Sequence, residues 1–118
     1  MKITMQCIEN IPEHTLVKYN NSDILVPFDG IGIIVGVSNK PRMAELSEGV
    51  TVNVCELIVK DVALCTLTSS FSRRGGVAYA DNGSINSTGS YEVGYVFPRS
   101  FQDTSDYQID DKVWVHLK

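Results

Sequence analysis

Apolar and polar residues alternate through the last third of the chain, and this pattern restricts the possible folds more than any other feature. It covers residues 75–81, 91–97 and 111–117. Alternation places every second side chain on the same side of an extended backbone, so each segment is predicted to be a strand with one face on a core. In the last segment, aliphatic side chains share one face and two rings share the other: Val113, Val115 and Leu117 against Trp114 and His116.

A tight turn is predicted within this region. Asn82-Gly83 is the strongest hairpin signal in the chain, because an Asn-Gly pair supplies the positive φ angles of a type I′ turn. The turn is expected to join strands over residues 77–80 and 85–88. A long loop over residues 98–110 then precedes the terminal strand.

Further strands are expected in the first two thirds of the chain, over residues 3–7, 14–19, 24–26, 31–37, 50–54, 57–59 and 62–67. Ile31–Val37 is rich in β-branched residues and lies between turn residues, so it is predicted to be buried on both faces at the centre of the fold. Residues 40–49 contain the only run of helix formers and are expected to be a connector with one helical turn. A change of phase at Cys55-Glu56 predicts a β-bulge or a break between two strands.

These elements predict an all-β fold, a single small β-barrel or sandwich of short antiparallel strands with at most one short helical turn. A chain of 118 residues has room for one domain whose core is stable without metals or disulfides. We expect residues 1–30 to form an N-terminal strand and arm, and residues 31–118 to form the barrel core.

Charge and cysteine content restrict the partners and the compartment. The net charge of −4 repels phosphate backbones and argues against nucleic acid as a partner. The three cysteines, Cys7, Cys55 and Cys65, match no zinc pattern and are expected to be free thiols in a reducing cytoplasm. The N-terminus lacks the apolar stretch of a secretory signal, and the longest apolar run is too short to cross a membrane. Synthesis in a cytoplasm and no membrane association are therefore expected.

The sequence predicts no catalytic, cofactor-binding or metal-binding residues. His14 and His116 are single histidines that suggest no triad, and the glycines match neither a P-loop nor a dinucleotide fingerprint. The only carboxylate cluster consists of Asp103, Asp106, Asp110 and Asp111. Its spacing is not that of an EF-hand, and whether this loop binds a cation stays open.

Loop residues supply the candidate contacts with a partner. Three aromatic residues and one basic pair are expected in loops, namely Phe71, Phe101, Tyr107 and Arg73-Arg74. Loop aromatics are frequent interface anchors. The alternative is that they fold back over the core as lids.

The order of turns and apolar segments resembles the head decoration (capsid cement) proteins of tailed bacteriophages. The segments that carry the resemblance are Ala44–Val52, Glu56–Lys60, Gly76–Ile85, Glu92–Val96 and Val113–Leu117. The match covers roughly residues 31–118 and consists of turns and apolar positions. It implies a β-tulip-like fold of the small β-barrel type.

The resemblance also implies a function. Members of this family bind the outside of the expanded capsid and strengthen it without catalysing a reaction. It implies the major capsid protein as partner, location on the virion exterior and a homo-oligomer, with a trimer favoured and a dimer possible.

Two other classes stay open. A carbohydrate- or receptor-binding β module of a phage tail or fibre would be indicated by clustered exposed aromatics that form a flat sugar platform. A small β-barrel enzyme would need convergent titratable groups, which the two histidines and the aspartate-rich loop do not supply.

Overall fold

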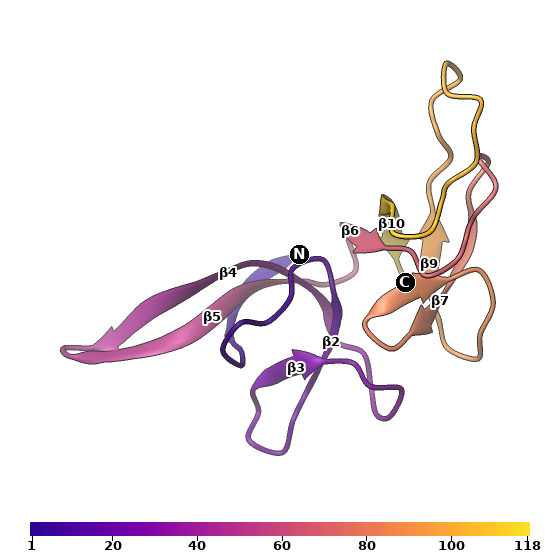
Figure 1. Cartoon of the computed structure of the whole chain (residues 1–118). Coiled ribbons are helices and arrows are strands. Elements are labelled where there is room, and N and C mark those ends of the chain that lie inside the picture. The colour runs from indigo at the N-terminus through magenta and orange to yellow at the C-terminus, as the bar shows by residue number, and fades with distance from the viewer.

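Ten strands form two antiparallel five-stranded sheets in the computed structural model, which describes residues 1–118 (Figure 1). The first sheet has the order β1-β5-β4-β2-β3 and consists of β1 (Lys2–Gln6), β2 (Leu16–Tyr19), β3 (Leu25–Pro27), β4 (Gly36–Ser47) and β5 (Val50–Ile58). The second has the order β6-β10-β9-β7-β8 and consists of β6 (Val62–Thr66), β7 (Gly76–Asp81), β8 (Ser84–Asn86), β9 (Glu92–Val96) and β10 (Lys112–Leu117). The structure contains no helix that is long and apolar enough to cross a membrane.

The all-β prediction is confirmed, and of the two predicted alternatives the sheets form a sandwich and not a closed barrel; no helix is present. The second sheet curls until its two edge strands approach each other, but only one isolated bridge, Leu67↔Ile85, joins them. A backbone hydrogen bond of 2.8 Å from Thr68 N to Ile85 O lies beside this bridge. Strand β8 has only three residues and cannot offer a full ladder to β6. The architecture is therefore that of a sandwich.

One apolar core lies between the two sheets. A cluster of sixteen buried residues includes Leu16, Val37 and Ile58 from the first sheet and side chains such as Val96 and Val115 from the second. Each sheet is apolar on the face that meets the other, and burying these faces against each other is what makes both stable in water. The alternation in the terminal strand is confirmed, because Val113, Val115 and Leu117 are buried while Trp114 and His116 are exposed.

The opposite face of the first sheet carries a second, smaller apolar cluster. Six buried residues form it: Cys7, Ile11, Val17, Leu25, Cys55 and Leu57. Leu16 and Val17 are neighbours in β2, yet they point into different clusters because successive side chains of a strand point to opposite faces. The first thirty residues therefore contribute three strands and part of both clusters.

The prediction of a central, doubly buried strand over Ile31–Val37 is wrong. Gly30 and Gly32 have φ values of 93° and 101°, so the backbone turns into the left-handed region twice and cannot continue as a strand. Ile31 and Ile33 are both 74% exposed, and β4 begins only at Gly36.

The expected connector over residues 40–49 is also wrong, because residues 40–47 continue β4 and only residues 48–49 form the turn to β5. Pairing with the valine-rich β5 overrides the modest local preference for helix, as in Ala44↔Val52. The predicted irregularity near Cys55 is confirmed, and the extra residue lies in β4, between the pairs Asn39↔Glu56 and Arg42↔Val54.

Beyond this bulge, β4 and β5 extend from the molecule as a two-stranded ribbon, residues 40–53 (Figure 1). The ribbon contributes to the elongated shape, with extents of 53 × 30 × 22 Å. Apolar side chains on it lie in solvent: Met43 is 63% exposed, Leu46 72% and Val50 47%. The ribbon is therefore an apolar projection without cover in the single chain.

The predicted hairpin at Asn82-Gly83 is confirmed in position but not in turn type. Residues Asp81 and Ser84 pair as expected, yet only Asn82 has a positive φ, of 50°, whereas a type I′ turn needs two. The glycine is required for another reason. A Cβ at Gly83 would lie 2.5 Å from Thr15 Cγ2, and Gly83 O accepts a hydrogen bond of 2.8 Å from Leu16 N.

This close approach gives a prediction for stability. Gly83→Ala should lower the free energy of unfolding by about 1–3 kcal/mol, because the added methyl overpacks the contact between the sheets. Thr15→Ser removes Cγ2 and keeps the hydroxyl that bonds to Glu13 O at 3.0 Å. In the Thr15→Ser background, Gly83→Ala should lower the free energy of unfolding by less than in the native chain. Urea unfolding of the native chain, the two single variants and the double variant measures this difference. An equal cost in both backgrounds would show that the two side chains do not meet.

Candidate functional site

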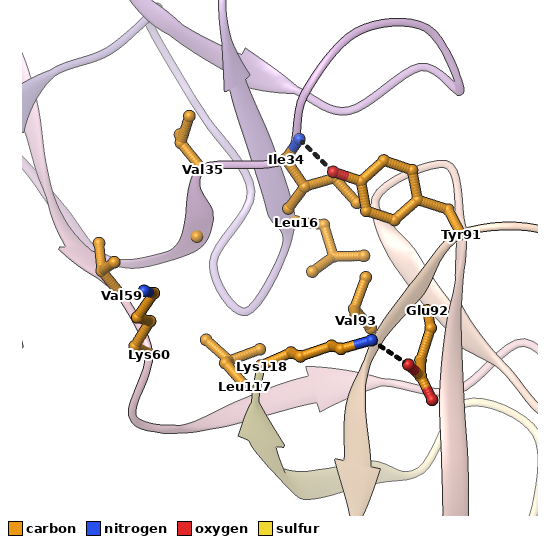
Figure 2. Close-up of a pocket in the computed structure, with 11 residues that line it drawn as sticks. Leu16, Ile34, Val35, Val59, Lys60, Tyr91, Glu92, Val93, Leu117 and Lys118 are labelled. Atoms are coloured by element: carbon orange, nitrogen blue, oxygen red, sulfur yellow. Dashed lines mark hydrogen bonds and ion pairs between the residues drawn. The ribbon is translucent and has the colours of Figure 1, made fainter.

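A pocket opens where the two sheets meet, and we call it the junction pocket (Figure 2). Its volume is about 280 Å³. The apolar part of its lining comes from five separate segments of the chain: Leu16, Ile34, Val35, Val59, Val93 and Leu117. Leu16, Val93 and Leu117 also belong to the shared core, so the pocket is an opening at the edge of that core.

Polar groups surround this apolar lining. The hydroxyl of Tyr91 accepts a hydrogen bond of 3.3 Å from Ile34 N and ties the 28–35 loop to the second sheet. The Lys118 ammonium pairs with Glu92, whereas the exposed Lys60 is drawn without any interaction (Figure 2). The rim thus holds two ammonium groups and one carboxylate, a net charge of +1, and an apolar socket with such a rim suits an apolar group that carries negative charge beside it.

A second surface lies on the outer face of the second sheet, and we call it the aromatic face. It consists of Val77, Tyr95, Phe97, Trp114 and His116. His116 is directly opposite Tyr95 in the ladder, and Phe97 N donates to Trp114 O at 3.1 Å. The rings of Phe97 and His116 stack with centroids 6.2 Å apart and planes 11° apart. Trp114 is 56% exposed and Tyr95 46%.

The expected contact residues divide into two groups. Phe71 and Tyr107 are buried and fold back, as the alternative expectation had it: their backbones pair as an isolated bridge, and Tyr107 donates its hydroxyl proton to Phe97 O at 2.7 Å. Loops 68–76 and 98–110 therefore lie side by side (Figure 1). Phe101 is 87% exposed, so for this residue a role in partner contact stays a prediction.

The basic pair is exposed beside the acidic loop. The backbone of Arg73 is fixed there, since its N donates to Asp106 Oδ1 at 2.9 Å and its O accepts from Arg99 N at 2.8 Å. The side chains of Arg73 and Arg74 are free to meet a partner, and this role also stays a prediction.

The aspartates of the 98–110 loop serve the loop itself. Asp103 accepts hydrogen bonds from the hydroxyl and N of Ser105 at 2.8 and 3.2 Å, and these bonds lower the pKa of its carboxyl. Asp111 accepts from Gln108 N at 2.8 Å. No group of three or more His, Cys, Asp or Glu side chains is placed to hold a metal ion.

The two histidines lie apart from each other in different settings. His14 is half-buried with its Nε2 3.3 Å from Glu13 Oε2, and His116 is part of the aromatic face. Neither lies beside a nucleophilic side chain in the hydrogen-bond network. The arrangement offers surfaces for binding.

The sequence contained a signal for the aromatic face. Alternation already placed Trp114 and His116 on the outer side, and the same period places Tyr95 and Phe97 together. The sequence did not show that β9 pairs with β10, and this pairing brings Tyr95 and Phe97 next to Trp114 and His116. No comparable signal exists for the junction pocket.

No protein-family model, no curated protein and no solved structure matches the chain. A proposal of function therefore depends on the two surfaces and on the order of turns in the sequence.

All three thiols are free and buried, and burial raises the pKa of each. The pKa rises to about 12 for Cys55, through burial first and the neighbouring Cys7 second, and to about 12 for Cys65 through burial. A thiolate is the reactive form. These cysteines are therefore packed side chains of low reactivity.

The thiols predict a dependence of stability on high pH. In the unfolded chain they lose protons near pH 8.5, whereas the folded chain holds the proton of Cys65 up to about pH 12. Stability should be unaffected by the thiols below about pH 8.5 and should fall as the pH rises toward 12. Cys65→Ala should reduce that slope in urea unfolding measured from pH 8 to 10.5. Labelling of the native protein by a disulfide reagent at pH 8 should be slow, and rapid labelling would contradict this picture.

Proposed function

We propose that this chain is a structural, non-enzymatic virion protein, a head decoration protein that binds the outer surface of an expanded tailed-phage capsid and stabilises it. The observation that carries the proposal is the amount of apolar surface left exposed on a chain whose two cores are already complete: the aromatic face and the ribbon. A sheet face with exposed Trp and Tyr is typical of an interface that is buried in an assembly. The order of turns in the sequence supports the same proposal, because it resembles that of the decoration proteins. The proposal includes the β-tulip-like fold that this resemblance implies.

The aromatic face suits contact with the major capsid protein. Buried aromatic side chains supply much of the binding free energy at protein interfaces, because they are large and lose little conformational freedom. Trp114 lies next to the half-buried Leu64 on β6, so a partner that covers the rings would also cover aliphatic surface. Phe101, Arg73 and Arg74 extend the proposed contact to the paired loops.

Stabilisation follows from preferential binding. A protein that binds the expanded shell and not the unexpanded one shifts the equilibrium toward the expanded state. Many copies on one particle multiply a modest free energy per contact. A homo-oligomer, a trimer favoured over a dimer, would match the local symmetry axis of the shell that it occupies.

The aromatic face also favours a second candidate, a carbohydrate-binding module of a phage tail or fibre. The C–H groups of a sugar ring pack on aromatic faces, and exposed rings on one sheet are the sign expected of such a module. Tyr95, Phe97 and Trp114 would supply the stacking surface, and His116 would supply a hydrogen bond.

Co-sedimentation with phage heads tests the first candidate. The purified protein should bind expanded, undecorated heads at a fixed ratio to the major capsid protein and should not bind unexpanded heads. Trp114→Ser should weaken binding by about 30-fold, the effect of a hot-spot residue worth roughly 2 kcal/mol. Ile33→Ser is the matched control, since Ile33 is 74% exposed on the other sheet's loop, and should leave binding unchanged.

Two outcomes would contradict the first candidate. Equal binding to expanded and unexpanded heads would remove the mechanism of stabilisation. Absence of binding to any head, together with binding to host surface glycans that Trp114→Ser abolishes, would support the second candidate instead.

A further inference from the structure

The ribbon and the junction pocket are chemically complementary. At the tip of the ribbon, Leu46 is 72% exposed and lies between Glu45 and Glu48 in the sequence. The pocket has an apolar interior, and its rim carries Lys60 and the Lys118–Glu92 ion pair, a net charge of +1 (Figure 2). An apolar side chain flanked by two carboxylates thus matches an apolar socket with a positively charged rim.

The ribbon has the properties of a segment that a partner completes. Backbone bonds from the residues around β2 reach β4 no further than Ser38, and those from the N-terminal segment reach β5 no further than Asn53. Between these points and the tip, the two strands pair only with each other. An isolated two-stranded hairpin is marginally stable in water, and apolar side chains on it make its exposure unfavourable.

The pocket has the size for this occupant. Its volume of about 280 Å³ lies at the lower limit of pockets for small organic ligands, roughly 300–1,000 Å³. One or two aliphatic side chains are a suitable filling. Leu46 and the neighbouring Val50, which is 47% exposed, project from the same end of the ribbon.

The two surfaces of one chain cannot meet each other. The tip lies at the start of β5, and Val59 and Lys60 of the pocket follow its end. Nine residues of extended strand separate them by about 30 Å at roughly 3.3 Å per residue. The two surfaces lie at opposite ends of one extended strand, so a docked ribbon has to come from a second copy.

We propose that the tip of the β4–β5 ribbon of one copy docks into the junction pocket of a second copy. Leu46 enters the apolar interior, and Glu45 and Glu48 face the positive rim, where Lys60 is the ammonium group without an ion pair in the single chain. The contact joins different surfaces of the two copies, so every copy still has one free tip or pocket. Repetition closes a ring if the rotation between copies allows it and otherwise continues as an open chain.

Sedimentation equilibrium of the protein alone tests this contact. The native chain, of 13.0 kDa, should associate with increasing concentration, and Leu46→Asp should stay at 13.0 kDa under the same conditions. Ile109→Asp is the matched control, because Ile109 is 61% exposed in another loop, and should associate like the native chain. Leu46 and Ile109 are both in solvent in the single chain, so unfolding midpoints of the variants should stay close to the native value.

Charge reversal gives a second, independent readout. Lys60→Glu and the double variant Glu45→Lys/Glu48→Lys should each associate at least tenfold more weakly than the native chain. A mixture of the two variants should regain association, because each tip then meets a pocket of opposite charge. Raising the salt concentration should reduce this regain.

Three results would overturn the proposal. The first is a native chain that stays at 13.0 kDa up to about 1 mM, the weakest affinity of interest. The others are association of Leu46→Asp as strong as that of the native chain, or a mixture of the charge variants that associates no better than its components. Because no capsid is present in these experiments, their failure would leave the proposed decoration function standing. Failure of head binding would likewise leave the contact between copies untouched.

Discussion

The apolar contact between the two sheets is the interaction on which the rest of the structure depends. Strand β2 is its centre: Leu16 enters the shared core, Val17 enters the smaller cluster, and Leu16 N bonds to Gly83 O of the other sheet at 2.8 Å. A buried hydroxyl fixes the approach to β2, because Ser38 Oγ donates to Pro12 O at 2.6 Å and accepts from Thr15 N at 3.3 Å. Loss of a partner there would leave a buried polar group unpaired, which costs more than the bond itself contributes.

The shared core also determines where apolar surface is left over. It uses the inner face of the second sheet and the middle of the first, so the outer rings of β9 and β10 and the distal half of the β4–β5 ribbon receive no cover from the chain. Single exposed apolar residues are normal, but Tyr95 and Trp114 are grouped on one face, and Met43, Leu46 and Val50 on one projection. The polar side chains inside are all hydrogen-bonded. Other exposed apolar side chains, such as Ile31, Phe101 and Ile109, lie singly in loops, so the aromatic face and the ribbon are the two places where such side chains are grouped on paired strands.

The local sequence pattern was sufficient to predict the half-buried strands, but it predicted the wrong structure for two segments. Lys112–Leu117 and Glu92–Val96 alternate and form strands as predicted, because half-buried strands need only a period of two. Ile31–Val35 has strand composition but lies in a loop, since Gly30 and Gly32 adopt positive φ angles that composition does not reveal. The 40–47 segment has helix formers but pairs with β5, an interaction between strands that outweighs small differences in local propensity. In both cases the decisive interaction lies outside the segment.

The candidate sites were harder to predict from local pattern than the strands, because each surface is formed by segments that are distant in the sequence. The aromatic face joins β9 and β10 across an intervening loop, and the junction pocket joins Leu16, Val59, Val93 and Leu117. Sequence reasoning instead selected three loop aromatics, of which Phe71 and Tyr107 pair with each other and are buried, whereas Phe101 is exposed. A loop aromatic is buried only where another segment covers it, as the paired loops cover Phe71 and Tyr107, whereas a ring on the outer face of a paired strand has no such cover. In a small sandwich of this kind, the outward positions of adjacent strands therefore predict grouped exposed rings, and position in a loop alone predicts neither burial nor exposure.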